Sequence, residues 1–117
     1  MKRKLRILFV CIANLHRSPA AEELYKNDPR YDVRSAGVAP YAKRLLTKED
    51  IRWADKVFVM DSDVLEIMKY IFNEVNTSSF IVLDIPDIYD TSVSEKKEEL
   101  RKILLSRLKP FLGEPTS

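Results

Sequence analysis

Apolar residues along the chain gather in four short runs separated by longer stretches of mixed character. The first run, residues 5–10, is bounded by charged residues and has the continuous apolar character of a strand buried on both faces of a parallel sheet. The predicted strands cover residues 5–10, 31–35, 56–60 and 80–83. The second strand stops at Ala36 and Gly37, and residues 38–46 have no clear period and are predicted to form a connecting loop.

Between and after these strands, apolar residues recur at helical spacing. The predicted helices cover residues 18–27, residues 47–53, a stretch that ends near residue 72, and a final stretch that begins at residue 94. Pro19 suits the first helical position of the first helix. Thr47 can cap the second, with Asp50 three residues on as its partner, and Asp61 or Ser62 can cap the third.

Short strands that alternate with helices favour a doubly wound α/β sheet with helices on both faces and right-handed crossovers. Ligands in such folds bind at the carboxyl ends of the strands. Three features fall at those ends here: the loop that starts at Cys11, the region of Asp61, and the loop of residues 84–90. The chain has 117 residues and no internal repeat or linker, so we expect a single domain over residues 1–117.

Composition and charge narrow the classes of function. The 20 basic and 18 acidic residues nearly balance, at a formal net charge of +2, and no basic stripe is interleaved with aromatic residues, so nothing favours a nucleic-acid partner. A single cysteine excludes a disulfide within the chain, and no apolar stretch approaches the length of a transmembrane helix. We therefore expect a cytoplasmic, reducing location and no membrane partner.

The loop between Cys11 and Arg17 carries the candidate chemistry. A strand delivers Cys11 to a tight loop, and the positive end of the following helix favours its thiolate form. The loop N–H groups predicted to bind a phosphoryl group belong to Ile12, Ala13, Asn14, Leu15, His16 and Arg17. Arg17 can also grip two phosphoryl oxygens through its planar guanidinium, and Ser18 can donate its hydroxyl to the sulfur. Asn14 tolerates the unusual backbone angles of a tight loop, and the side chain of His16 is expected to be structural.

The sequence VCIANLHRSP at residues 10–19 resembles the signature loop of the low-molecular-weight protein tyrosine phosphatase family. The likeness continues in the family's order at residues 34–37 (RSAG), at residues 54–61 around the third strand, and at residues 85–89 (IPDIY), which resemble the family's acid-bearing loop. The resemblance implies a four-stranded parallel sheet in the order 2-1-3-4. It also implies a cysteine-dependent phosphomonoester hydrolase, a protein tyrosine phosphatase that needs no metal and no cofactor.

The mechanism implied by the resemblance has two steps. Cys11 attacks phosphorus while protonated Asp87 gives its proton to the leaving alcohol or phenol, and a phosphocysteine forms. Asp87 then activates the water that hydrolyses this intermediate, while Arg17 and the loop amides hold the phosphoryl oxygens. The expected substrate is a phosphorylated protein or a small aryl phosphate, the expected inhibitors are phosphate, sulfate and vanadate, and a monomer is expected.

Several assignments stay open at the level of sequence. Asp84 or Asp90 could take the acid role in place of Asp87, and Tyr89 could line the substrate pocket or pack over the loop. The alternatives to a phosphatase are an arsenate reductase that uses an external thiol, because the chain has one cysteine, and a phosphate-binding module without turnover. The acidic residues at the strand ends also suggest a phospho-accepting receiver domain, which is disfavoured because the first strand ends in cysteine rather than an acidic pair.

The chain also departs from the family pattern. The family usually has glycine at the position of Ala13, a second cysteine at that of His16 and proline at that of Ile88. It also has a longer segment, with an extra helix and aromatic residues that line the substrate site, where this chain has only residues 37–47. The chain is thus similar to a compact bacterial subgroup of predicted phosphatases.

Overall fold

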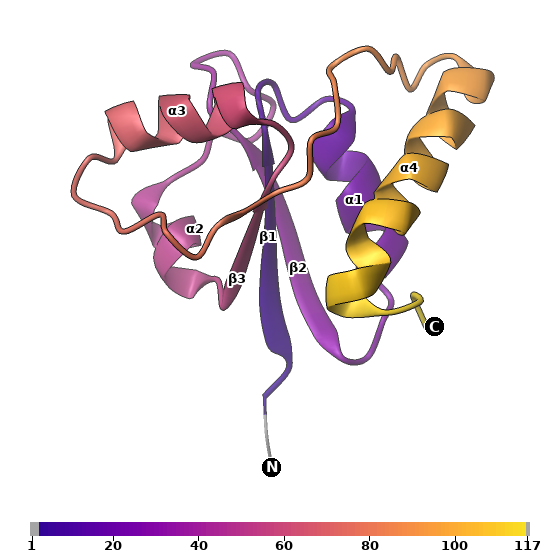
Figure 1. The fold of residues 1–117 in the computed structure, drawn as a ribbon, viewed down its shortest axis with the longest axis horizontal. Coiled ribbons are helices and arrows are strands. Elements are labelled where there is room, and N and C mark those ends of the chain that lie inside the picture. The colour runs from indigo at the N-terminus through magenta and orange to yellow at the C-terminus, as the bar shows by residue number, and fades with distance from the viewer. Residues whose placement is uncertain (1–2, 117) are drawn as a thin grey trace.

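A parallel sheet organises the chain (Figure 1). The structure is a computed structural model and describes residues 3–116. Its strands are β1 (Leu5–Cys11), β2 (Tyr31–Gly37), β3 (Lys56–Val59) and β4 (Ile81–Val82). Its helices are α1 (Arg17–Tyr25), α2 (Lys48–Trp53), α3 (Ser62–Ile71) and α4 (Ser94–Leu112). All neighbouring strands pair in parallel in the order β2-β1-β3-β4, so the predicted fold class and strand order are confirmed.

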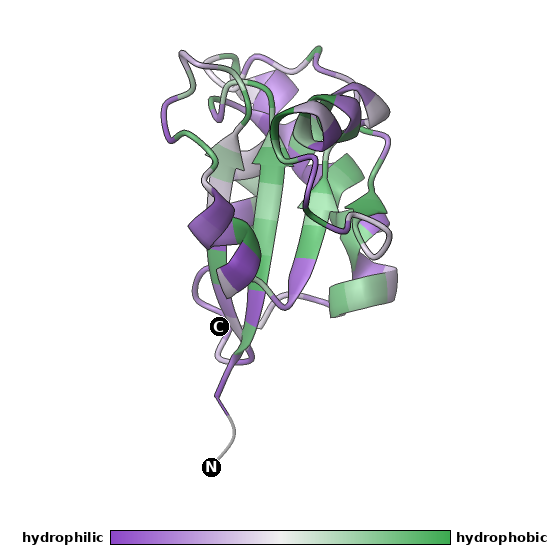
Figure 2. Cartoon of the chain, turned by 90° about the vertical axis from the view of Figure 1, so that its left-hand side faces the viewer, coloured by the Kyte–Doolittle hydropathy of each residue, from purple (hydrophilic) through white to green (hydrophobic). Residues whose placement is uncertain are grey.

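Alternate residues of β1 serve two separate hydrophobic layers, because successive side chains of a strand point to opposite faces. Ile7 and Phe9 pack in the layer covered by α1 and α4, whereas Leu8 and Val10 pack in the layer covered by α2 and α3. Helix residues that complete the two layers are Ala21, Tyr25, Leu100, Leu104 and Leu108 on one side, and Ile51, Trp53, Val64 and Met68 on the other. Figure 2 shows the resulting hydrophobic sheet between more hydrophilic helices.

Several element ends differ from those expected from the sequence. Strand β1 continues to Cys11, which pairs with Gly37 of β2. Helix α1 begins at Arg17 rather than one residue later, because the N–H of Ala20 already bonds to the carbonyl of His16. Strand β4 is shorter than the predicted residues 80–83, and it pairs with β3 at the edge of the sheet.

The predicted helix caps are confirmed. Thr47 and Asp50 form a reciprocal capping box at the start of α2, and the Asp61 side chain accepts the N–H of Val64 at 2.9 Å at the start of α3. Asp50 is buried, which by itself raises the pKa of its carboxyl, but the hydrogen bonds from Arg44 and Thr47 outweigh burial and lower it.

The four strands point the same way, so the segments that follow them meet at one edge of the sheet. Cys11 and Gly37 lie at this edge together with the start of α3 and the segment that follows β4. None of the helices within residues 3–116 is long and apolar enough to cross a membrane.

At the amino ends of the strands, Asp55 connects the start of the described chain to the start of β3. Its carboxylate accepts bonds of 2.8 and 2.9 Å from the two terminal nitrogens of Arg3, and one of 2.8 Å from the backbone N–H of Arg6. These bonds, that of the Arg3 side chain foremost, lower the pKa of Asp55 to about 2.

We expect the contribution of Asp55 to the free energy of unfolding to be full above about pH 4 and lost on acidification to about pH 2, because its pKa is lower in the folded state than in the unfolded state. Urea unfolding of the wild type and of Asp55→Asn across this range measures the effect. The stability difference between the two proteins should shrink toward low pH. A difference that stays constant across the range would contradict this account.

Candidate active site

The loop that joins β1 to α1 wraps around the thiol of Cys11, which is 3% exposed. The Sγ atom lies 2.9 Å from the hydroxyl of Ser18 and accepts the backbone N–H of Asn14 at 3.2 Å. Asn14 has a φ of 56°, in the left-handed region that asparagine tolerates better than most residues. This backbone conformation directs the N–H of Asn14 toward the sulfur of Cys11.

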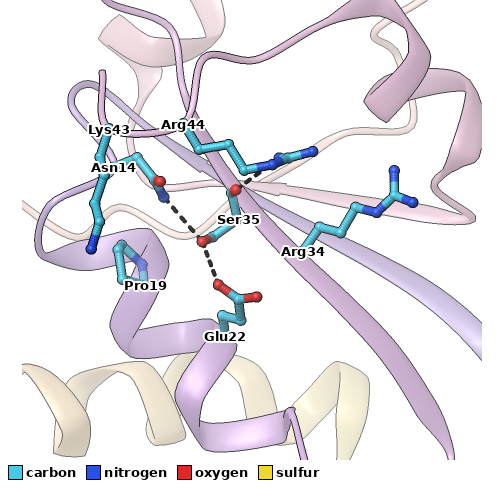
Figure 3. Close-up of a pocket in the computed structure, with 7 residues that line it drawn as sticks. All are labelled: Asn14, Pro19, Glu22, Arg34, Ser35, Lys43 and Arg44. Carbon is cyan, nitrogen blue, oxygen red and sulfur yellow. Dashed lines mark hydrogen bonds between the residues drawn. The ribbon is translucent and has the colours of Figure 1, made fainter. Parts of the chain in front are cut away.

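A chain of hydrogen bonds braces this turn from behind (Figure 3). The side-chain amide of Asn14 donates to the hydroxyls of Ser18 and Ser35, at 2.9 and 3.0 Å, and the Ser35 hydroxyl donates to Glu22 at 2.6 Å. Because the amide nitrogen can only donate, the Ser18 hydroxyl accepts from it, and the hydroxyl's own proton has two acceptors in reach, the sulfur of Cys11 at 2.9 Å and the carbonyl of Ala36 at 3.4 Å. A thiolate at Cys11 can only accept, so it would take hydrogen bonds from both the Ser18 hydroxyl and the Asn14 N–H, which stabilise the anion.

The cavity drawn in Figure 3 lies behind the loop and is not lined by Cys11. Its volume is about 290 Å³, and its lining includes the basic residues Arg34, Lys43 and Arg44. Arg44 donates to the carbonyl of Ser35 at 2.9 Å and also pairs with Asp50. Part of the positive charge around this cavity thus serves to hold β2 and the start of α2 together.

Arg17 is buried at the start of α1, with 1% of its surface exposed. One terminal nitrogen, Nη1, donates to the Asp61 carboxylate at 2.6 Å and to the carbonyl of Ile85 at 2.8 Å, and Nε lies 3.6 Å from the Asp87 carboxylate. The other terminal nitrogen, Nη2, is buried and has no hydrogen-bond partner among the described residues. The guanidinium is thus held in place with one donor group unused.

A second cavity, of about 220 Å³, opens in front of the loop. It is lined by Cys11, Ile12, Ala13, Leu15, His16, Arg17 and Asp87. The thiol, the guanidinium and a carboxyl group therefore share one cavity. Leu15 is 55% exposed and gives this cavity an apolar side.

The two other acidic residues of the loop 84–90, Asp84 and Asp90, lie outside the Cys11 cavity. Asp84, two residues after β4, has a φ of 55°. The carboxylate of Asp90 accepts bonds from the hydroxyl and the N–H of Ser92, which lower its pKa. Geometry therefore favours Asp87 over both neighbours for an acid–base role.

The other predicted site residues lie as follows. Tyr89 packs partly buried against the hydrophobic layer under α1 and α4 and is not among the residues that line the Cys11 cavity, so a substrate contact stays a prediction. His16 directs its ring to Thr91, with Nδ1 at 2.8 Å from the hydroxyl.

The carbonyls of Ile12 and Ala13 accept N–H groups of the segment 38–46, at 2.9 and 3.0 Å. That short segment thus supports the loop from outside.

Known structures share this fold over nearly the whole chain. The YwlE arginine phosphatase from Geobacillus stearothermophilus is 28% identical, with a TM-score of 0.69 and 92% of each chain covered. The tyrosine phosphatase Wzb from Escherichia coli, solved in complex with phosphate, is 23% identical with a TM-score of 0.76, and the match covers 93% of this chain and 96% of Wzb. A low molecular weight protein tyrosine phosphatase from Streptococcus pyogenes is 19% identical with a TM-score of 0.75, covering 92% and 93% of the two chains.

The resemblance to low molecular weight protein tyrosine phosphatases that the sequence predicts is therefore confirmed, and this chain has their fold. These neighbours are cysteine-based phosphatases, and Cys11 and Arg17 stand in this chain with the spacing of a cysteine, five residues and an arginine. No protein-family model and no curated protein sequence matches the chain.

Several residues that hold the site are not evident from the sequence. Asp61 is predicted as a helix cap, but its second carboxylate oxygen also accepts a hydrogen bond from Arg17. A carboxylate at the end of the strand beside β1 is a signal that could have revealed this pair. Glu22 follows Ser18 by four residues and so lies on the same face of α1, a spacing that could have linked it to the loop.

Gly37 of β2 sets how closely the loop can approach the sheet. A Cβ at this position would lie 2.6 Å from the carbonyl oxygen of Ile12, 2.8 Å from the Cβ of Ala42 and 2.9 Å from the carbonyl carbon of Ala13. Two of these atoms are backbone of the candidate phosphate-binding loop and cannot move away as a flexible side chain would.

Gly37→Ala is therefore expected to lower the free energy of unfolding by about 1 to 3 kcal/mol, as overpacking does, and to displace the loop. Urea unfolding measures the loss. In an Ala42→Gly background the substitution should still destabilise, because the two backbone contacts remain. A Gly37→Ala protein as stable as the wild type would show that the loop does not lie against this strand.

Proposed function

We propose that this protein is a cysteine-dependent phosphatase whose nucleophile is Cys11. The observation that carries the proposal is the cavity shared by the Cys11 thiol, the Arg17 guanidinium and the Asp87 carboxyl. The buried Nη2 of Arg17 adds support, since a phosphoryl oxygen held between the Cys11 and Arg17 side chains would supply the hydrogen-bond acceptor that Nη2 lacks.

In the proposed first step, the sulfur of Cys11 forms a bond to phosphorus as the bond to the leaving oxygen breaks, and Asp87 delivers its proton to that oxygen. The Asn14 N–H and the Ser18 hydroxyl, which both reach the sulfur, favour its anionic form before attack and again when it leaves. In the second step Asp87, now ionised, takes a proton from water as the water oxygen bonds to phosphorus and the sulfur–phosphorus bond breaks, which releases inorganic phosphate and the Cys11 thiolate. Arg17 and the loop N–H groups hold the charge on the phosphoryl oxygens throughout.

For the substrate, we propose phosphotyrosine in a protein or a small aryl phosphate. The exposed Leu15 on the wall of the cavity, and Ile88, which is 65% exposed beside Asp87, offer apolar contacts to an aromatic ring. Wzb, a neighbour in fold, is a tyrosine phosphatase, whereas YwlE is an arginine phosphatase, so a phosphoarginine peptide is the informative competing substrate. We further propose that the protein acts as a cytoplasmic monomer and is inhibited by phosphate, sulfate and vanadate.

The proposal predicts that purified protein hydrolyses phenyl phosphate and a phosphotyrosine peptide in the presence of EDTA, with inhibition by vanadate, and that Cys11→Ser abolishes this hydrolysis. Release of inorganic phosphate measures the reaction. A phosphoarginine peptide assayed alongside decides between the two substrate classes. Hydrolysis that survives in Cys11→Ser, or none by the wild type on any of these substrates, would refute the proposed nucleophile or the activity.

Asp87→Asn is expected to lower kcat on phenyl phosphate by about 10²- to 10⁴-fold, the usual contribution of a positioned general acid or base. Asp84→Asn is the matched control, because Asp84 lies outside the cavity and asparagine tolerates its positive φ. Steady-state kinetics compare the two variants. Equal losses in both, or a larger loss in Asp84→Asn, would remove Asp87 from the acid role.

A further inference from the structure

Two consecutive residues of the candidate phosphate-binding loop hold both ends of the segment that carries Asp87. Arg17 donates from Nη1 to the carbonyl of Ile85 at 2.8 Å, two residues before Asp87. The ring of His16 meets Thr91, four residues after Asp87. Asp87 therefore lies in a short segment whose two ends each form a hydrogen bond with one of two neighbouring loop residues.

The contact of His16 with Thr91 has a defined direction. The backbone N–H of Thr91 points to Nδ1 of His16 at 3.2 Å, and the hydroxyl of the same threonine lies 2.8 Å from the same nitrogen. A backbone N–H can only donate, so Nδ1 is the acceptor, and the proton of the neutral ring is on Nε2. The ring thus acts as an acceptor for Thr91.

His16 stands at the N-cap of α1, where a polar side chain commonly bonds to the first turn of its own helix. Its side chain makes no such cap bond and instead spans 75 positions of sequence to reach Thr91. His16 also lines the Cys11 cavity together with Asp87. The ring thus lies between the loop and the far end of the acid-bearing segment.

We infer that His16 is a positioning residue that holds Asp87 over Cys11 through its contact with Thr91. The inference rests on the proposed function and adds to it the group that fixes the general acid. Without the contact, the segment keeps the bond from Arg17 to Ile85 and the ion pair of Arg17 with Asp87 but loses its hydrogen bonds at Thr91, so Asp87 spends less time within reach of the leaving oxygen. A displacement of about 1 Å at a reacting centre can cost about 100-fold in rate.

The test compares two substrates that differ in how much they need the acid. Phenyl phosphate releases a basic phenoxide that must be protonated, whereas 4-nitrophenyl phosphate releases a stabilised anion that needs little help. For His16→Ala we expect kcat on phenyl phosphate to fall by about 10- to 100-fold, with a much smaller loss on 4-nitrophenyl phosphate. Inhibition by inorganic phosphate should persist, because the loop N–H groups remain in place.

His16→Asn should recover most of the activity that His16→Ala loses, since the amide oxygen of asparagine can stand near Nδ1 and accept from Thr91. A substitution at Thr91 gives a second control. Thr91→Val removes the hydroxyl and should lower kcat on phenyl phosphate in the wild type but have little further effect in His16→Ala, because the two residues act through one contact.

Hydrogen exchange at the backbone amide of Thr91 monitors the contact independently of catalysis, and we expect this exchange to be faster in His16→Ala than in the wild type. Equal losses on both aryl phosphates, or unchanged exchange at Thr91 in folded His16→Ala, would overturn the inference. The proposed function fails by a different result, an inactive wild type or an active Cys11→Ser.

Discussion

The buried guanidinium of Arg17 is the interaction on which the rest of the site depends. A charge out of water is costly unless it is paired and hydrogen-bonded, and Arg17 has three partners on two other segments. Asp61 follows β3, Ile85 follows β4, and Asp87 lies two residues further on. One side chain thus joins the loop after β1 to the ends of two other strands. The same contacts place Asp87 on the cavity that Cys11 lines.

The other side of the loop depends on β2. Ser35 links the side chain of Asn14 to this strand, and Gly37 lets the loop backbone lie against it without a Cβ in the way. The segment 38–46 covers the loop from outside, and two of its N–H groups donate to carbonyl groups of the loop. This segment is short, yet it supports the loop that would hold a phosphoryl group. A compact chain can therefore keep the geometry of the loop while offering a different surface to the rest of a substrate.

Much of the fold could be predicted because the strands are short apolar runs, and the alternation of strand and helix leaves few topologies. The nucleophile and its loop could be predicted because they are contiguous, from Cys11 to Ser18, so local spacing carries the signal. The partners of the loop could not, because they are distant in sequence. The pair of His16 with Thr91 and that of Arg17 with Asp61 arise only when the ends of separate strands meet at one edge of the sheet. Polar residues such as Glu22 have no pattern that separates a buried role from solvation on a helix surface.

The most direct test of the account is to trap the phosphoryl group on Cys11. In Asp87→Asn, a substrate with a good leaving group such as 4-nitrophenyl phosphate should still transfer its phosphoryl group to the thiolate, while the second step lacks its base and slows. Rapid quenching and mass spectrometry of the peptide that contains Cys11 should then show the added phosphoryl group, together with a burst of nitrophenol equal to the enzyme present. Turnover by this variant with the phosphoryl group on another residue, or without a burst and with no phosphorylated peptide, would contradict the account.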